Sequence, residues 1–175
     1  MTFTSKEKGN KKYYEEFMYI TSSYYIFKKR PKTKVHSLIN MYRVYIIIFF
    51  VLSVVFLFIP RFIDLSALFL AFFCVGIYLF IESKYRLREY LKYGDSLVKI
   101  DEEGIENICD DKMAVKLPWE VIEYIIINKY SICVLPKNFS AILIGIEISA
   151  KDDVYKALKK YKKLDLLVDN SDKYK

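Results

Sequence analysis

Cysteine and histidine are scarce in this chain of 175 residues. The three cysteines, Cys74, Cys109 and Cys133, lie far apart without paired spacing, and His36 is the single histidine. An odd, scattered set of cysteines argues against a disulfide framework and against a zinc site. His36 has no Asp, Cys or second His near it in the sequence, which argues against a metal-binding or catalytic role. We therefore expect reduced thiols and no bound metal.

The sequence also lacks the motifs that carry common enzymatic chemistry. It has no P-loop, no GxSxG, no HExxH and no serine–histidine–acid set. Two acidic clusters, at 101–103 and 110–111, lack the alternating oxygen ligands and the length of a calcium loop. We therefore predict a protein that is not an enzyme and that holds no cofactor.

Charged residues are absent from two long apolar stretches. The sixteen residues 44–59 and the seventeen residues 65–81 contain no Asp, Glu, Lys or Arg. At ~1.5 Å rise per residue, each stretch forms a helix about 25 Å long, close to the ~30 Å hydrocarbon core of a bilayer. A buried helical hairpin in a soluble protein is the alternative, but so short a chain could not cover two helices that are apolar on every face. The sequence predicts a transmembrane hairpin at 42–82, with spans at about 42–59 and 63–82.

The sequence PRFID, at 60–64, separates the two predicted spans. Pro60 ends the first helix, while Arg61 and Asp64 keep the turn in water. Because five residues can join only neighbouring antiparallel helices, both chain ends are expected on the same side of the membrane. Small residues on one face of the second span are expected to line the seam between the spans: Ala67, Ala71 and Cys74.

Positive charge is concentrated on the outer flanks of the predicted hairpin. The turn has only Arg61, which Asp64 offsets. The positive-inside rule therefore predicts a multi-pass protein of the plasma membrane with both termini in the cytoplasm. The basic flanks would also attract anionic lipid, and they account for much of the net charge of +7 without a nucleic-acid partner. The flanking cations are Lys28, Lys29, Arg30, Lys32, Lys34 and Arg43 before the hairpin, and Lys84, Arg86, Arg88 and Lys92 after it.

The segments beside the hairpin are polar or amphipathic. Residues 1–12 are rich in lysine and are expected to form a disordered basic tail. Residues 13–41 are predicted to form an amphipathic juxtamembrane segment, which either lies on the membrane or packs on the domain after the hairpin. Residues 83–94 are expected to form a basic juxtamembrane linker. One side of the helix expected in the juxtamembrane segment carries Tyr14, Phe17, Met18, Thr21 and Tyr25.

From residue 95 the helical periodicity gives way to short β-like segments separated by turn residues. The Ile- and Val-rich runs around a polar tip at Asn128 and Lys129 are expected to be central strands. A capping box formed by Ser149 and Asp152 predicts a closing amphipathic helix up to Lys163. The predicted strands cover 98–100, 105–109, 113–117, 124–129 and 130–136, and a further one lies within 141–148.

The fold class predicted from these patterns is an α+β membrane protein. The transmembrane hairpin is followed by a small antiparallel β meander, which the C-terminal amphipathic helix closes. This cytoplasmic domain is expected to cover 95–165, and 166–175 is expected to be a polar tail.

A set of residues after the hairpin follows the order of a known family pattern: Gly104, Ile105, Trp119, Ile122, Ile125, Ile132, Pro136 and Lys137. With the preceding hairpin and the final helix, they make residues 40–165 resemble the YcxB-like proteins. The C-terminal module of that family is similar to a reduced bacterial pleckstrin-homology-type (PH-like) domain. The resemblance implies a membrane-anchored domain of undefined role.

Two residues are candidates for binding a partner. Trp119, the lone tryptophan, either anchors a partner or plugs the open end of the sheet. Lys137, at the end of an apolar strand, either binds a phosphate or carboxylate or marks solvent. The first hairpin loop of the domain, DEEG at 101–104, has the wrong charge to grip a phosphorylated headgroup.

The sequence favours a non-enzymatic integral membrane protein whose cytoplasmic domain binds a protein partner or assembles with copies of itself. A membrane-surface sensor or regulator of lipid or envelope stress is the first alternative, since the flanks are basic and tyrosines lie near the membrane boundary. An accessory subunit of a transporter or of an immunity system is the second. Two spans without a charge inside them make a poor conduit alone.

Overall fold

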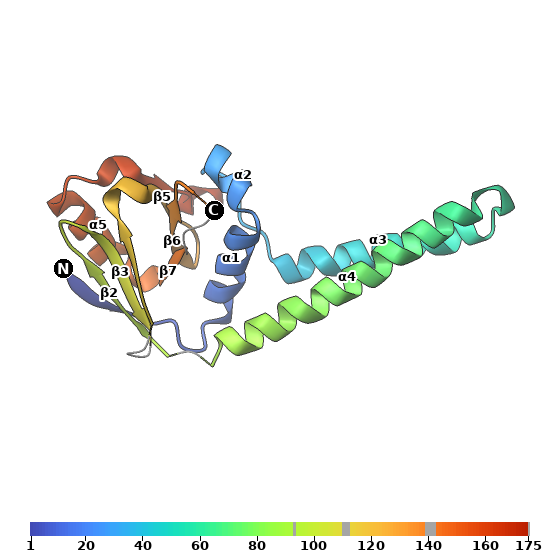
Figure 1. The fold of residues 1–175 in the computed structure, drawn as a ribbon, viewed down its shortest axis with the longest axis horizontal. Helices are drawn as coiled ribbons and strands as arrows, with labels where there is room; N and C mark the ends of the chain where they lie inside the picture. Colours follow the sequence, from blue (N-terminus) through green and yellow to red (C-terminus); the bar gives the residue numbers. More distant parts are fainter. Residues whose placement is uncertain (93, 110–112, 139–142, 175) are drawn as a thin grey trace. The chain divides into compact units, whose positions relative to one another are not determined.

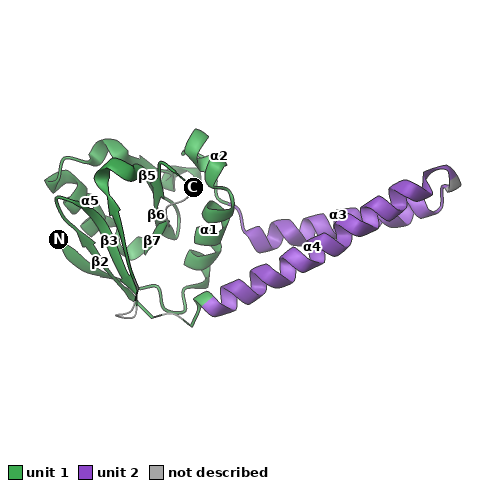
Figure 2. Cartoon of the chain, in the orientation of Figure 1, with its two compact units in different colours: residues 1–35, 90–175 green, residues 36–89 purple. Residues whose placement is uncertain are grey.

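The computed structural model describes residues 1–92, 94–109, 113–138 and 143–174. The chain divides into two compact units, shown in different colours in Figure 2. Unit 1 contains residues 1–35 and 90–175, and unit 2 contains residues 36–89. Unit 2 is therefore an insertion into unit 1, which is built from both ends of the chain.

Unit 2 consists of two long helices joined by a short turn (Figure 1). Helix α3 covers Leu38–Leu57, the 3₁₀ turn η1 covers Pro60–Phe62, and α4 covers Ile63–Tyr90. The predicted hairpin and its turn are confirmed as secondary structure. The first part of the predicted linker at 83–94 is helical, because α4 continues to Tyr90. Residues 83–90 contain no Gly or Pro to stop a helix, and Arg86 forms an i,i+4 ion pair with Glu82.

In unit 1, one sheet, which we call sheet A, has the strand order β1-β2-β3-β4 and is antiparallel throughout. Its strands are β1 (Thr2–Ser5), β2 (Ser96–Ile100), β3 (Gly104–Cys109) and β4 (Met113–Pro118). The predicted disordered tail at 1–12 is wrong, because β1 pairs with β2 and places Phe3 opposite Val98. The backbone of β1 fills the edge of β2, and Phe3 packs against the core, which the lysine-rich composition did not indicate.

The second sheet of unit 1, sheet B, has the strand order β7-β6-β5-β8. Its strands are β5 (Ile122–Ile127), β6 (Ser131–Pro136), β7 (Ile144–Glu147) and β8 (Leu167–Asp169). The sheet is antiparallel except that β8 runs parallel to β5. The domain therefore has two sheets where a single meander was expected. The polar tail expected at 166–175 is wrong as well, since its apolar start forms β8.

The hydrophobic core of unit 1 lies between the two sheets. It contains Val98 and Ile105 from sheet A, and Ile125, Val134 and Ile146 from sheet B, all fully buried. Helix α5 (Lys151–Lys160) closes this core with Val154, Ala157 and Leu158.

The closing helix α5 forms as predicted, but its ends differ from the prediction. The capping box is wrong, because Ser149 lies in the 3₁₀ turn η3 (Ile148–Ala150) and its backbone N–H donates to the Glu147 carboxylate at 2.7 Å. The helix ends at Lys160 and not at Lys163, since Lys162 adopts a positive φ of 57° that no helix continues.

The opposite face of sheet B is covered by the N-terminal segment. Helices α1 (Lys11–Ser22) and α2 (Tyr24–Lys29) lie there, and α1 contacts β6. A Cβ on Gly145 would lie 2.8 Å from the Phe17 ring and against the Tyr13 hydroxyl, so α1 approaches β7 closely. Of the two arrangements considered for this segment, packing on the domain is the one observed. Its buried face differs in part from the prediction, since Tyr13 and Ile20 are buried and Tyr25 is exposed.

We predict that Phe3→Ala lowers the free energy of unfolding of unit 1 by about 1–3 kcal/mol, below the loss typical of a fully buried phenylalanine. Thr4→Ala is the matched control, since Thr4 is exposed on the same strand and should be nearly neutral. Thermal unfolding in detergent can be followed by the fluorescence of Trp119, which lies in the core of unit 1. Equal stability of the two variants would contradict the packing of β1.

Candidate functional site

The seam of unit 2 is made of serine, glycine and phenylalanine residues. The hydroxyl of Ser66 donates to the carbonyl of Ser53 at 2.9 Å, and both serines are buried. A Cβ on Gly76 would lie 3.2 Å from Ile46, so glycine allows the helices to approach. Phenylalanine rings fill the remaining length as the pairs Phe49–Phe72, Phe50–Phe73 and Phe56–Phe69, each with centroids 5.4 Å apart.

The seam predicted from small residues is wrong, because Ala67, Ala71 and Cys74 are exposed. The two serines in the apolar runs, Ser53 and Ser66, are the sequence feature that marks the observed seam. A serine hydroxyl inside an apolar helix needs a hydrogen-bond partner, and the neighbouring helix supplies one.

The outward faces of unit 2 are apolar along most of its length. Both α3 and α4 are long and apolar enough to cross a membrane by length and composition. Large side chains such as Ile47, Val51, Phe58 and Val75 are each about half exposed or more. Contiguous apolar surface on this scale marks a site of contact with a membrane or with protein.

In unit 1, a buried carboxylate fastens α1 to the β5–β6 hairpin. The Glu16 side chain accepts hydrogen bonds from the backbone N–H of Tyr130 and from the Ser131 hydroxyl, both at 2.9 Å. Burial raises the pKa of the Glu16 carboxyl, and these hydrogen bonds oppose the rise. Both hydrogen-bond donors belong to the fold itself, which is typical of a structural carboxylate.

A second buried carboxylate lies between β1, α1 and β2. The Ser96 hydroxyl donates to Glu7 at 2.6 Å, and the Tyr13 hydroxyl also bonds to this carboxylate. Burial raises the pKa of Glu7 and of Tyr13. The Ser5 hydroxyl also bonds to Glu7 and accepts from the Glu147 backbone N–H at 2.8 Å, which joins the edge of sheet A to sheet B.

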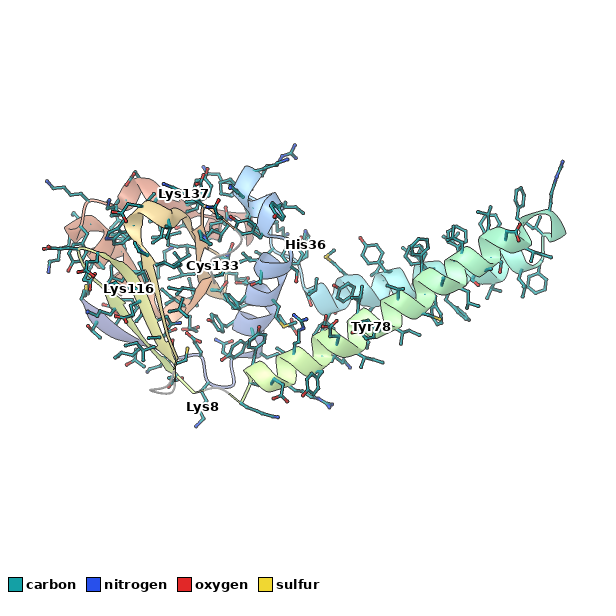
Figure 3. All side chains as sticks on the ribbon, in the orientation of Figure 1. Lys8, His36, Tyr78, Lys116, Cys133 and Lys137 are labelled. Carbon is teal, nitrogen blue, oxygen red and sulfur yellow. The ribbon has the colours of Figure 1, made fainter. Side chains whose placement is uncertain are left out.

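The thiol of Cys133 lies on β6 and is fully buried (Figure 3). Burial raises its pKa to about 12, so the thiol is not a nucleophile at neutral pH. Within the described ranges, no three His, Cys, Asp or Glu side chains come together in a way that could hold a metal ion.

Trp119 lies in the 3₁₀ turn η2 (Trp119–Val121) between β4 and β5. The side chain is 6% exposed and belongs to the core, and its indole N–H donates to the Asp101 carbonyl at 3.1 Å. This position resembles the expected plug at the end of the sheets and leaves little of the ring for a partner.

Lys137, by contrast, is exposed at the end of β6 (Figure 3). Its backbone N–H donates to the Val121 carbonyl at 2.7 Å, so the two sequence candidates lie at the same end of sheet B. The Lys28 ammonium donates to the Lys137 carbonyl, and the Tyr24 hydroxyl donates to the Pro136 carbonyl at 2.7 Å. These two bonds fasten α2 beside Lys137.

The most exposed apolar side chains of unit 1 are on α2, which sequence analysis missed as a surface. Tyr25 is 67% exposed and Ile26 is 52% exposed, and no other large apolar side chain in the described part of unit 1 exceeds half exposure. The cations Lys29 and Arg30 follow this pair after two intervening residues and are also exposed. We call Tyr25, Ile26, Lys29 and Arg30 the α2 patch. Its signal in the sequence is the absence of any Asp or Glu from 17 to 63.

Comparison with known proteins gives no relative: no family model, no curated protein and no solved structure matches the chain.

We predict that the stability of unit 1 falls as pH rises from about 4.5, the ordinary pKa of glutamate, through the raised values of Glu7 and Glu16. A raised pKa in the folded state means that the fold favours the protonated form, so its contribution is complete below the ordinary value and is lost above the raised one. Glu7→Gln and Glu16→Gln keep an acceptor oxygen and should flatten this slope.

The measurement is the midpoint of unfolding against pH, followed by Trp119 fluorescence in detergent. Glu120→Gln removes an exposed carboxylate and serves as the control. If the stability of the Glu16→Gln variant depended on pH as steeply as that of the parent protein, the Glu16 carboxylate would not be the source of this pH dependence.

Proposed function

We propose that the protein is an integral membrane protein whose helices α3 and α4 both cross the bilayer. The proposal is supported by the length of the two helices and by their apolar outward faces. The hydrogen bond between Ser66 and Ser53 supports it further, since in lipid a serine hydroxyl must find its partner within the protein. The turn η1, with Arg61, then lies at the far surface of the membrane.

The observation that carries the topology is the insertion of unit 2 into unit 1. Strand β1 precedes the hairpin and pairs with β2, which follows it, so both flanks of the hairpin belong to one sheet. Residues that share a sheet lie on the same side of a membrane. The excess of Lys and Arg on these flanks then favours the cytoplasm for both termini and the plasma membrane as the location.

For unit 1, we infer the role of a non-enzymatic interaction module that binds a protein partner or a second copy of the chain. Its buried carboxylates are engaged in structural hydrogen bonds, and Lys99 and Lys116 of sheet A form ion pairs with Asp101 and Glu103 of the β2–β3 turn. Edge strand β4 carries Lys116 and Pro118, which discourage pairing with another strand, so contact through side chains is favoured.

The two facing sheets with a closing helix support a relation to PH-like domains, and with the hairpin they support membership of the YcxB-like family as a proposal. The alternative role of a membrane-surface sensor or regulator is favoured by one specific observation, the exposed α2 patch. The role of an accessory subunit has no such observation on its side.

The topology predicts a pattern of thiol labelling in intact cells. With Cys74 and Cys109 replaced by serine and the buried Cys133 retained, Arg61→Cys should react with a membrane-impermeant maleimide from outside. Lys6→Cys and Lys159→Cys, both at exposed positions of unit 1, should react only after permeabilisation. Labelling of Lys6→Cys in intact cells would contradict the topology, and release of the chain from membranes by alkaline carbonate would contradict insertion.

The interaction role predicts that the full chain, crosslinked in cells and purified in mild detergent, carries a bound protein or a second copy. Native mass spectrometry of the purified material measures this directly. A chain recovered alone and monomeric at every detergent concentration would count against the role.

A further inference from the structure

We propose that the α2 patch docks unit 1 on the anionic phospholipid surface of the membrane that the hairpin enters. The inference rests on the proposed insertion of α3 and α4 and adds a lipid-binding surface outside the spans. The ligand is the bilayer surface itself, with phosphate-bearing headgroups for the cations and the headgroup–acyl boundary for the apolar side chains.

The first support is the way in which α2 is held. Tyr24 and Phe27 are 2% and 0% exposed and fix one side of the helix to unit 1, with the Tyr24 hydroxyl bonded to the Pro136 carbonyl. Tyr25 and Ile26 lie between these two anchors in the sequence and are therefore forced outward. The exposure of two adjacent apolar side chains costs free energy in water, and insertion into an interface removes that cost.

The second support is charge. Lys29 and Arg30 follow the apolar pair after Phe27 and Lys28 and are exposed, as are Lys32 and Lys34 in the segment that leads to α3. No carboxylate occurs between residues 17 and 63, so no acidic side chain of this segment neutralises them. A tyrosine and an aliphatic side chain beside long cationic side chains are the composition of an interfacial anchor, in which the cations extend to the phosphates.

The third support is the short chain between unit 1 and α3. The Asn170 side-chain amide donates to the Pro31 carbonyl at 2.9 Å and to the Thr33 carbonyl at 3.4 Å, which fastens this segment to unit 1. Only residues 34–37 remain before Leu38, the first residue of α3. Because so few residues span less than about 20 Å, a membrane that α3 enters is within reach of unit 1.

The test uses the full chain in lipid nanodiscs, either of phosphatidylcholine alone or of phosphatidylcholine with phosphatidylglycerol. Hydrogen exchange of peptides covering 23–34 reports docking of α2. We expect slower exchange in the anionic nanodiscs and loss of this difference at high salt. Each cation near an anionic surface raises the docking equilibrium constant about fivefold, so Lys29→Gln/Arg30→Gln should reduce that constant by about 25-fold.

Matched variants separate the patch from general effects. Tyr25→Ser/Ile26→Ser should also abolish the lipid-dependent protection, whereas Tyr155→Ser and Lys159→Gln/Lys160→Gln, on exposed positions of α5, should keep it. Unchanged exchange in β5 and β6 shows that a variant is folded.

The outcomes distinguish this inference from the proposed function. If the chain enters nanodiscs but exchange over 23–34 is the same in both lipids, the docking inference is overturned and insertion stands. Protection of α2 that requires an added protein and not anionic lipid also overturns it, in favour of a protein partner. If the chain does not enter nanodiscs at all, both proposals fail.

Discussion

The structure of unit 1 depends on one constraint: sheet B is apolar on both faces and must be covered on both. In β6 every residue from Ser131 to Pro136 is buried, with Val134 facing the core and Cys133 facing α1. Sheet A and α5 cover one face, but the other is covered by α1, which precedes the hairpin in the chain. The hydrophobic effect thus brings the two ends of the chain together.

This constraint determines how the hairpin is held. Unit 2 leaves unit 1 after α1 and α2 and returns to it at β2, so unit 1 is tethered at two points (Figure 2). Glu16 and Glu7 add hydrogen bonds that fix α1 and β1 in register, and their burial makes these contacts sensitive to pH. In the proposed membrane topology, a domain tethered in this way stays on one side of the membrane. The proposed docking of α2 would also determine which face of unit 1 contacts the membrane.

Sequence patterns gave the features that depend on neighbouring residues. The two apolar helices and the turn at Pro60 followed from uninterrupted runs, and most strands from β2 to β6 followed from local alternation. Contacts between distant residues could not be predicted in this way. Strand β1 forms by pairing with the free edge of β2, and β8 forms by pairing with the free edge of β5. The local composition of the lysine-rich N-terminal segment and of the polar C-terminal segment does not indicate these distant pairings. The exposure of the α2 patch depends on the burial of Tyr24 and Phe27, which local sequence patterns do not indicate.

Segments on both sides of the hairpin form one domain, and a disulfide between β1 and β2 is the sharpest test of this pairing. The main chains of Met1 and Ile100 hydrogen-bond to each other, so Thr4 and Leu97 form a non-hydrogen-bonded pair whose side chains lie close enough for a disulfide. With Cys74 and Cys109 replaced by serine, oxidation of Thr4→Cys/Leu97→Cys in isolated membranes should protect both new thiols from alkylation. Thr4→Cys/Lys116→Cys, on the two outer strands of sheet A, should stay reactive. Free thiols in the first variant after oxidation would show that β1 does not pair with β2.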